Sequence, residues 1–395
     1  MSDVAAKPAF DLKALIRKAA KNPLALPVCA LVVVIVFTAI ITGIKNGQNF
    51  FSIHIKNVAL PGQADKYVLY GSIIDILNRS SELIILAVGM TLVVASSGGT
   101  DISVGSVMAI SGALIVRCLG ESYDFYAMLP LFAILIGILG GIACGAFNGF
   151  LVARLKIQPM VATLILFTAG RGIAQLISSR PVFDAAGNKI SEATGVILYV
   201  RKESFQWIGN FLPHSIVPTP IFIAIVFVAL ICLFLRFTAF STYVKTVGIN
   251  PKAARLVGLN SVFITFLCYL ICGLCAGVAG MIASSRIYSS DANNIGLNME
   301  LDAILAVALG GNSLAGGKFN IAGSIIGAVT IQALSTSLYS IGVPANQLPV
   351  YKAIVVILIV LFQSPRFKSL LERLKAKKAA LAQKNVVAHK GWDLI

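Results

Sequence analysis

The chain has 395 residues, of which 57% are hydrophobic and only 12% are charged. About a quarter of the residues of a soluble domain are charged, so this composition excludes an ordinary globular protein and favours one that lies in a lipid bilayer. The formal net charge of +16 lies mainly at the chain ends and in a few loops, and no globular basic domain is present to bind nucleic acid.

Ten apolar segments follow one another along the chain. A helix needs about 20 apolar residues to cross the hydrocarbon core of a bilayer, so the segments predict an all-α polytopic membrane protein with about ten transmembrane helices. The third and eighth segments are short and adjoin glycine-rich interruptions, which predicts broken helices. The expected helices are Leu24–Ile44, Ile73–Ser96, Val104–Leu119, Ala127–Ala153, Pro159–Ser178, Pro218–Phe237, Val262–Ala283, Leu301–Gly310, Asn320–Ile341 and Leu348–Gln363.

The ends of the chain are expected to lie outside this membrane domain, which we place at residues 24–365. Residues 1–23 are polar and basic and do not read as a signal peptide, because the apolar segment that follows them is long enough to span the bilayer. Residues 366–395 form a second basic tail, which is either a helix on the anionic inner leaflet or a solvated segment.

Positive charge indicates the orientation of the chain, because Lys and Arg collect on the cytoplasmic side of membrane proteins. If all ten segments cross, the basic clusters fall on one side, so both termini are expected in the cytoplasm and residues 45–72 and 179–217 outside. The clusters are Lys13, Arg17, Lys18 and Lys21, then Arg154 and Lys156, then Lys245, Lys252 and Arg255, and finally Arg366, Lys368, Arg373, Lys375, Lys377 and Lys378.

Two interruptions resemble each other, in LVVASSGGTDISVGSVMAISGALI (Leu92–Ile115) and ILAVALGGNSLAGGKFNIAGSIIGAV (Ile304–Val329). Non-helical backbone at membrane depth is tolerated only inside protein or beside a water-filled cavity, and in transporters it often lines the path. We therefore expect a parallel internal repeat and a path or gate at these places, the alternative being ordinary cytoplasmic turns with Asp101 as a helix cap. The candidate residues are Gly98, Gly99, Thr100, Asp101, Ser103, Gly310, Gly311, Asn312 and Ser313.

The long connection STYVKTVGINPKAARLVGLN (Ser241–Asn260) predicts a short helix on the cytoplasmic side. Asn250 is a good N-cap and Pro251 a good first helical residue, and Gly258 can end the helix. Ala253, Ala254, Leu256 and Val257 would form a small apolar face that suits docking into a groove of a partner protein. A loop helix at the membrane interface, without a partner, is the alternative.

Here the residues resemble a known family. The stretch GINPKAARLVGLN is similar to the coupling helix of ATP-binding-cassette (ABC) importer permeases for monosaccharides, and further motifs resemble the ribose and galactoside permeases from about residue 73 to 367. The family commonly has Gly-Ile-Asp in the first interruption, whereas Thr100 precedes Asp101 in this chain. The motifs are GGTDISVGSVMAISGA, ELDAILAVALGGNSLAGGKFN and YLICGLCAGVAGMI, and YGSIIDILNR, LKIQPMVATLILFTAGRGIAQLI and DANNIGLNMELDAI look closest to the galactofuranose-type branch.

This resemblance implies a permease subunit of the bacterial inner membrane that moves a monosaccharide inward by alternating access. Such permeases act as dimers, with a second copy or a sister permease, and they work with a cytoplasmic ATPase and a periplasmic or lipid-anchored sugar-binding protein. It also assigns the contact with the ATPase to a coupling helix at about residues 248–260. The residues concerned are Gly248, Asn250, Pro251, Ala253, Ala254, Arg255 and Gly258.

ATP chemistry is expected on the partner rather than on this chain. The phosphate-binding motif GxxxxGK[ST] is missing, and GGNSLAGGK at residues 310–318 lacks both its spacing and the final Ser or Thr, since Phe319 comes next. We therefore expect no enzymatic activity, no cofactor and no metal site in this chain, and place ATP and magnesium on the ATPase.

Other readings of the sequence remain open at this point. An ion-coupled secondary transporter would need buried acids as ion sites, for which Glu82 and Asp101 are the candidates. An ABC permease for branched-chain amino acids would share the fold but bind a zwitterion. For a sugar, Thr100, Ser103, Asn312 and Ser313 offer suitable partners, whereas the charged residues near span ends suit ion pairs or headgroup anchors equally well. These are Arg171, Arg286, Glu300 and Asp302.

Overall fold

The computed structural model describes residues 24–46, 50–57, 67–121, 125–183, 189–213 and 215–363. The expected basic segments at 1–23 and 366–395 lie outside these residues. Among the described residues, seven helices are long and apolar enough to cross a membrane. They are α2 (Ala25–Asn46), α3 (Ser72–Ser97), α5 (Pro130–Gly149) with its π-helical continuation η1 (Phe150–Arg154), α6 (Pro159–Ile177), α8 (Thr219–Phe237), α11 (Ser261–Ile287) and α13 (Ile321–Ile341).

The other three expected spans are helical but short. The helices α4 (Val104–Leu119), α12 (Met299–Leu309) and α14 (Leu348–Gln363) have 16, 11 and 16 residues. The first glycine-rich interruption precedes α4 and the second follows α12, so each of these helices is bounded by an interruption at one end. The first interruption follows the long helix α3 and the second follows the short helix α12. The two halves of the expected parallel repeat therefore differ in the lengths of these helices. The remaining described helices are α7 (Glu203–Gly209), α9 (Phe240–Ile249) and α10 (Pro251–Leu256).

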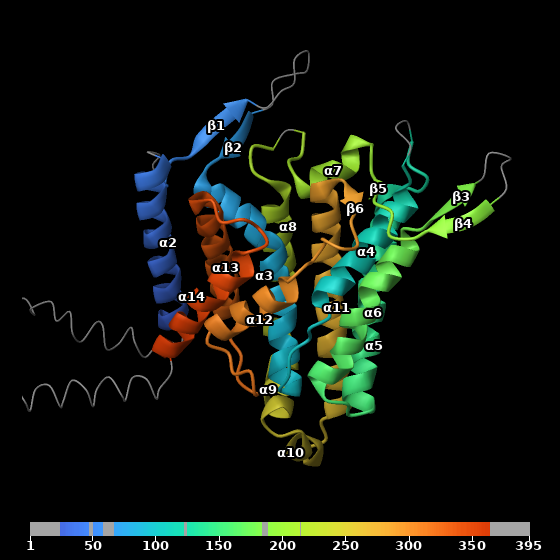
Figure 1. The fold of residues 1–395 in the computed structure, drawn as a ribbon. Helices are drawn as coiled ribbons and strands as arrows, with labels where there is room; N and C mark the ends of the chain where they lie inside the picture. The colour runs from blue at the N-terminus through green and yellow to red at the C-terminus, as the bar shows by residue number, and fades with distance from the viewer. Residues whose placement is uncertain are drawn as a thin grey trace, which may run out of the picture. The chain divides into compact units, whose positions relative to one another are not determined.

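The chain divides into two compact units, residues 1–341 and 342–395. In the second unit the structure describes α14, and the other described elements belong to the first. Within the first unit α11 is central, packing against α3, α4 and α5 (Figure 1). Large apolar side chains on α2, α5, α6 and α8 remain exposed, as expected for helices that face lipid.

Small residues let α5 and α11 approach closely. A Cβ atom added to Gly145 would lie 2.5 Å from the carbonyl oxygen of Tyr269 and 2.9 Å from the Cα atom of Gly273. Gly141 and Gly277 make a similar contact one turn away. Helices in a bilayer gain little from hydrophobic burial against one another, so close van der Waals packing through small residues holds such pairs together.

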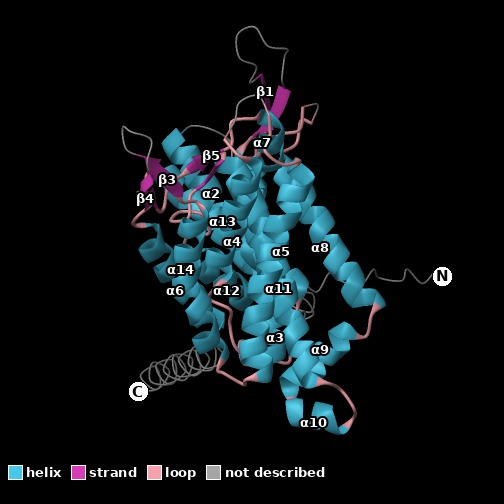
Figure 2. Cartoon of the chain, turned by 90° about the vertical axis from the view of Figure 1, so that its right-hand side faces the viewer, coloured by secondary structure: helices cyan, strands magenta, loops and turns pink. Residues whose placement is uncertain are grey.

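Short strands and α7 lie at one end of the first unit, and α9 and α10 lie at the other (Figures 1 and 2). We call these the strand end and the α10 end. All strand pairs are antiparallel: β1 (His54–Asn57) with β2 (Tyr67–Tyr70), β3 (Arg180–Phe183) with β4 (Lys189–Ala193), and β5 (Leu198–Tyr199) with β6 (Ser289–Ser290). Five of these strands lie within segments 45–72 and 179–217, which are expected outside the membrane.

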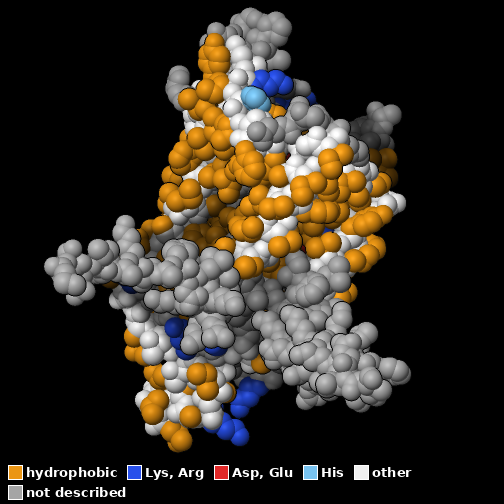
Figure 3. All heavy atoms as spheres, turned by 90° about the vertical axis from the view of Figure 1, so that its left-hand side faces the viewer, with side chains coloured by type: hydrophobic (Ala, Val, Ile, Leu, Met, Phe, Trp, Pro, Cys, Tyr) orange, Lys and Arg blue, Asp and Glu red, His pale blue; other side chains and the backbone are white. Residues whose placement is uncertain are grey.

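The loops at the α10 end carry cations and, among the described residues, no exposed acid. The described carboxylates of the first unit belong to the strand end or are enclosed among the helices, as Asp101 is at 2% exposure. One face of the molecule shows a broad apolar area with Lys and Arg side chains near its lower edge (Figure 3). The cations at this end are Arg154, Lys156, Arg236, Lys245, Lys252, Arg255 and Lys318.

The glycine contact between α5 and α11 predicts that a Gly→Ala substitution, which usually stabilises a helix, destabilises the protein at this contact. Gly145→Ala would press a methyl group onto the backbone of α11, and we expect overpacking to cost about 1–3 kcal/mol and to lower the melting temperature in detergent. Gly172→Ala in α6 is the matched control, because a Cβ atom there meets nothing within 4 Å. This control should be neutral or stabilise the protein by up to about 1 kcal/mol. Equal melting temperatures for the two variants would contradict the packing argument.

Candidate functional site

The first interruption is a buried turn between α3 and α4. Gly98 ends α3 in the left-handed region at φ 64°, and its N–H donates to the Val94 carbonyl over 3.0 Å. Asp101 then accepts hydrogen bonds from the N–H of Ser103 at 2.9 Å and from its hydroxyl at 2.7 Å. Asp101 thus has the expected capping role, and the residue that it caps is Ser103, immediately before α4. Thr100, Asp101 and Ser103 are all buried.

Polar side chains from α5 and α6 hold this turn in place. The Asn148 amide donates to the Ser103 hydroxyl over 2.8 Å, and the Ile102 N–H donates to the Thr163 hydroxyl over 3.2 Å. Gly99 leaves room for the ring of Pro159 at the start of α6. The sequence analysis did not single out Asn148 and Thr163, although a buried amide and hydroxyl within apolar spans are the signal that could have found them.

The second interruption is organised by the Asn312 side chain. Its amide nitrogen donates to the Val307 carbonyl over 3.0 Å and to the Ser324 hydroxyl over 2.8 Å, and its oxygen accepts from the Asn320 N–H. Asn312 therefore joins the end of α12 to the start of α13. The Ser313 N–H faces the Lys318 carbonyl at 3.5 Å. Gly310 leaves room for the Gly323 backbone, and Gly311 has a positive φ of 77°.

The predicted short helix is present as α10, with the expected start and stop. The Asn250 side chain accepts from the N–H groups of Lys252 and Ala253 at 3.0 and 3.1 Å, and Pro251 is the first helical residue. Gly258 follows the helix at φ 82°. The Arg255 guanidinium donates from Nε to the Ser261 hydroxyl over 2.7 Å, which fastens α10 to the first residue of α11.

The apolar face of this region differs from the expected one. The Ala254 side chain is 0% exposed, so it anchors α10 to the rest of the protein instead of facing outward. Ile249, Leu256 and Val257 are 77%, 89% and 73% exposed. Helical spacing alone could not tell which apolar positions point inward. The outward apolar surface at the α10 end therefore consists of Ile249, Leu256 and Val257, beside the exposed Ala253.

Gly98, Gly248, Gly316 and Gly317 form a contact that we call the glycine junction. The Gly317 N–H donates to the Ala95 carbonyl in α3 over 2.9 Å. A Cβ atom on Gly248 would collide with that same carbonyl oxygen and lie 2.6 Å from the Gly317 nitrogen, and one on Gly316 would lie 3.1 Å from the Gly98 Cα atom. The end of α3, the end of α9 and the second interruption therefore meet backbone to backbone, as their placement in Figure 1 also shows.

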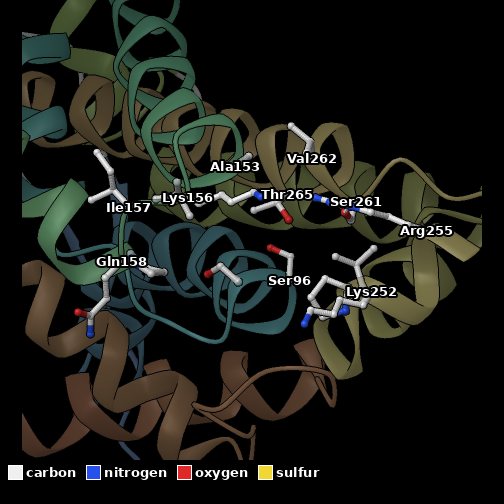
Figure 4. Close-up of a pocket in the computed structure, with 15 residues that line it drawn as sticks. Ser96, Ala153, Lys156, Ile157, Gln158, Lys252, Arg255, Ser261, Val262 and Thr265 are labelled. Atoms are coloured by element: carbon white, nitrogen blue, oxygen red, sulfur yellow. Dashed lines mark hydrogen bonds between the residues drawn. The ribbon is translucent and has the colours of Figure 1, made fainter.

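A cavity of about 380 Å³ opens beside α10. Lys252 and Arg255 of α10, together with Lys156 from the η1–α6 connection, supply its charges. The side chains of Ser96 in α3 and Thr265 in α11 point toward one another across it (Figure 4). None of the candidate path residues lines this cavity. It is thus separate from the two interruptions, although it shares the wall formed by the end of α3.

The charged residues near the span ends take structural positions. Arg286 pairs with Glu82 at 3.2 Å and donates to the Asn78 carbonyl at 3.0 Å. The Arg171 guanidinium donates to three carbonyl oxygens of the segment after β6, at 2.9, 3.0 and 3.2 Å. That segment leads to Glu300, which is 3% exposed and packs against Gly105 where the first turns of α4 and α12 meet.

Comparisons with known proteins now identify the family. The family described as branched-chain amino acid transport system / permease component matches residues 72–363. The chain is 44% identical over 310 residues to the galactofuranose transporter permease YtfT of Escherichia coli K12, covering 78% of this chain and 84% of the relative. It is 37% identical to the fructose import permease FruF of Bifidobacterium longum, covering 84% and 88%, and 36% identical to the ribose import permease RbsC of Escherichia coli K12, covering 75% and 86%.

No solved structure matches the chain. The matched family covers more than half of it and includes all elements from α3 to α14. The chain therefore belongs to the permease family of bacterial ABC importers, as a multi-pass membrane protein that forms a non-catalytic, membrane-embedded subunit.

Proposed function

We propose that the chain translocates a monosaccharide inward, of the galactofuranose type or another pentose or hexose. The observation that carries the proposal is the identity of 44%, 37% and 36% to permeases named for galactofuranose, fructose and ribose, each over most of the chain. The family description names branched-chain amino acids instead. A zwitterion needs charged partners, whereas the polar candidates of the interruptions offer mainly hydroxyl and amide groups, which suit a neutral sugar.

ATP drives this transport through a separate ATPase that binds ATP and magnesium. An ion-coupled mechanism would need buried acids that are free to bind a proton or a cation. Glu82 is instead paired with Arg286, and one oxygen of Asp101 accepts two hydrogen bonds from Ser103. Their engagement in structural contacts supports the ATP-driven mechanism.

The α10 end faces the cytoplasm in this proposal. Its surplus of Lys and Arg, with no exposed acid among the described residues, is the distribution expected of cytoplasmic loops. We propose the same side for both termini, as follows if about ten segments cross. The strand end then faces outward and receives the sugar from a periplasmic or lipid-anchored binding protein. A second copy or a sister permease completes the path.

The ATPase docks on Ile249, Leu256 and Val257, and the residues of the coupling stretch support this surface. Asn250 and Pro251 start α10, Ala254 anchors it, Arg255 ties it to α11 and Gly258 ends it. Ala253 lies beside the docking surface and Gly248 forms its link to the bundle. Closure of the ATPase dimer moves this region, and alternating access follows from that motion.

The glycine junction passes the motion on to both interruptions, which form the gate. Gly98 and Gly99 directly follow α3. Gly316 and Gly317 lie in the connection between α12 and α13, which begins with Gly310, Gly311, Asn312 and Ser313. Backbone contacts of this kind transmit small displacements, because no flexible side chain lies between them. Thr100, Asp101 and Ser103 keep the first part of the gate folded.

Uptake into proteoliposomes tests the function directly. The permease is reconstituted with its ATPase, with ATP inside and binding protein outside, and a panel of labelled galactofuranose, ribose, fructose and branched-chain amino acids is supplied. We expect accumulation of one of the sugars only when ATP and both partners are present. Accumulation of an amino acid, or uptake by the permease alone along an ion gradient, would refute the proposal.

Leu256→Asp tests the docking surface. A charge at an exposed apolar contact should weaken the ATPase complex, and we expect at least a tenfold loss of uptake with unchanged melting temperature of the permease. Ile190→Asp at the strand end is the matched control, since Ile190 is also well exposed at 66%. The ATPase retained on affinity-tagged permease is measured in parallel. Equal ATPase retention by both variants would exclude this surface as the docking site.

Gly248→Ala tests the glycine junction. The added methyl group meets the Ala95 carbonyl and the Gly317 backbone. These backbone atoms cannot relieve the clash by a rotamer change, as a side chain could. We expect ATPase binding to persist while sugar uptake per ATP hydrolysed falls severalfold. Gly43→Ala in α2 is the control, because a Cβ atom there meets nothing within 4 Å. Unchanged coupling in Gly248→Ala would show that the junction does not transmit the motion.

A further inference from the structure

The cavity beside α10 concentrates positive charge without a matching acid. Lys156, Lys252 and Arg255 contribute their side chains to it, and its lining includes no Asp or Glu. Within the described part of the chain, the ammonium groups of Lys156 and Lys252 form no ion pair. The Arg255 guanidinium donates to the neutral Ser261 hydroxyl over 2.7 Å. Three like charges around one cavity repel one another, so an anion between them would lower their energy.

The deeper part of the cavity supplies uncharged hydroxyl groups, of which that of Ser96 donates to the Val93 carbonyl over 3.1 Å. Ser96, Ser261 and Thr265 are 6%, 4% and 8% exposed and lie on its walls, whereas the cations are exposed at its rim. Figure 4 shows the Ser96 and Thr265 side chains directed toward the same space, with Lys252 and Arg255 at one end of it. An anion held by the cations would therefore also reach hydroxyl groups.

Two long helices begin at this cavity. Pro159 is the first residue of α6 and Ser261 the first residue of α11, and both line the wall. The N-terminal end of a helix carries a partial positive charge and favours a nearby anion. These helix ends add to a site that already has three cations and buried hydroxyls.

We infer that this cavity binds a phosphate group, carried by an anionic phospholipid headgroup or by inorganic phosphate. A phosphate offers several acceptor oxygens in different directions, which matches donors that come from α10, α11 and the η1–α6 connection. Leu155, Met160 and Val161, which are neighbours in sequence of the lining residues Lys156 and Pro159, are 53%, 51% and 52% exposed. They offer acyl chains a surface next to the headgroup site.

The bound phosphate bridges α10 to the helices of the bundle. Lys252 and Arg255 belong to α10, whereas Lys156 and Thr265 belong to parts that are fixed among the long helices. The inference rests on this geometry and not on the sugar or on the ATPase, so binding is measured on the full-length permease alone. Failure to bind phosphate would leave the transport proposal intact, and failure of sugar uptake would leave the phosphate site intact.

The test compares lipid binding by native mass spectrometry after delipidation in a neutral detergent. Phosphatidylglycerol is titrated against phosphatidylcholine, and inorganic phosphate is titrated separately with the melting temperature as the readout. We expect the double variant Lys156→Gln, Lys252→Gln to bind phosphatidylglycerol at least tenfold more weakly than the wild type. The matched control is the double variant Arg236→Gln, Lys318→Gln, which removes the same charge from exposed residues at the same end, outside the cavity.

A third variant separates a built site from general charge attraction. Thr265→Val removes a buried hydroxyl without changing the net charge, and we expect a severalfold loss of affinity. Binding of phosphatidylglycerol alone identifies the lipid headgroup, and stabilisation by inorganic phosphate as well identifies an open phosphate site. Equal losses in both double variants would overturn the inference. Binding of neither ligand by the wild type would also overturn it and leave an acidic segment of the ATPase as the occupant.

Discussion

The architecture depends on one constraint, that backbone groups leaving a helix inside a bilayer must find partners within the protein. The turn between α3 and α4 meets it through Asp101 and Thr163, and the loop between α12 and α13 meets it through Asn312. Asn148 and Thr163 reach the first turn from α5 and α6, and Asn312 joins α12 to α13, so each interruption is also a point where several helices are joined. A break in a helix is therefore a place of strong local organisation in this protein.

Glycine has a second part in the same design. In the α5–α11 pair and at the glycine junction it brings backbones together with no side chain between them. The two uses differ in consequence: the first fixes a helix pair, whereas the second joins segments that are far apart in sequence and includes the end of α9, next to α10. The positively charged cavity is lined by Ser96 and Ser97 of the same helix end, and α10 is held to the bundle through the backbone contact of α9 and by the Arg255–Ser261 hydrogen bond.

Much of this could be predicted from the sequence, because hydropathy and helix signals act locally. Every expected apolar segment is helical, both interruptions occur where glycines predicted them, and Asn250 with Pro251 starts α10. The expected bounds of α4 and α14 are the observed ones, and α12 begins two residues and ends one residue earlier than expected. The inward direction of Ala254, the partners Asn148 and Thr163 and the meeting of Gly98 with Gly316 depend on tertiary contacts, which no local pattern encodes.

The direct connection of α10 to α11 makes α11 a lever arm. The helix has 27 residues and follows α10 after residues 257–260, and at its other end it leads straight into β6, which pairs with β5. A helix of this length is about 40 Å long, so a tilt of about 3° about one end displaces the other by about 2 Å. A small push at the α10 end would thus appear at the opposite face as a movement of the β5–β6 pair, and the two faces need no other mechanical link.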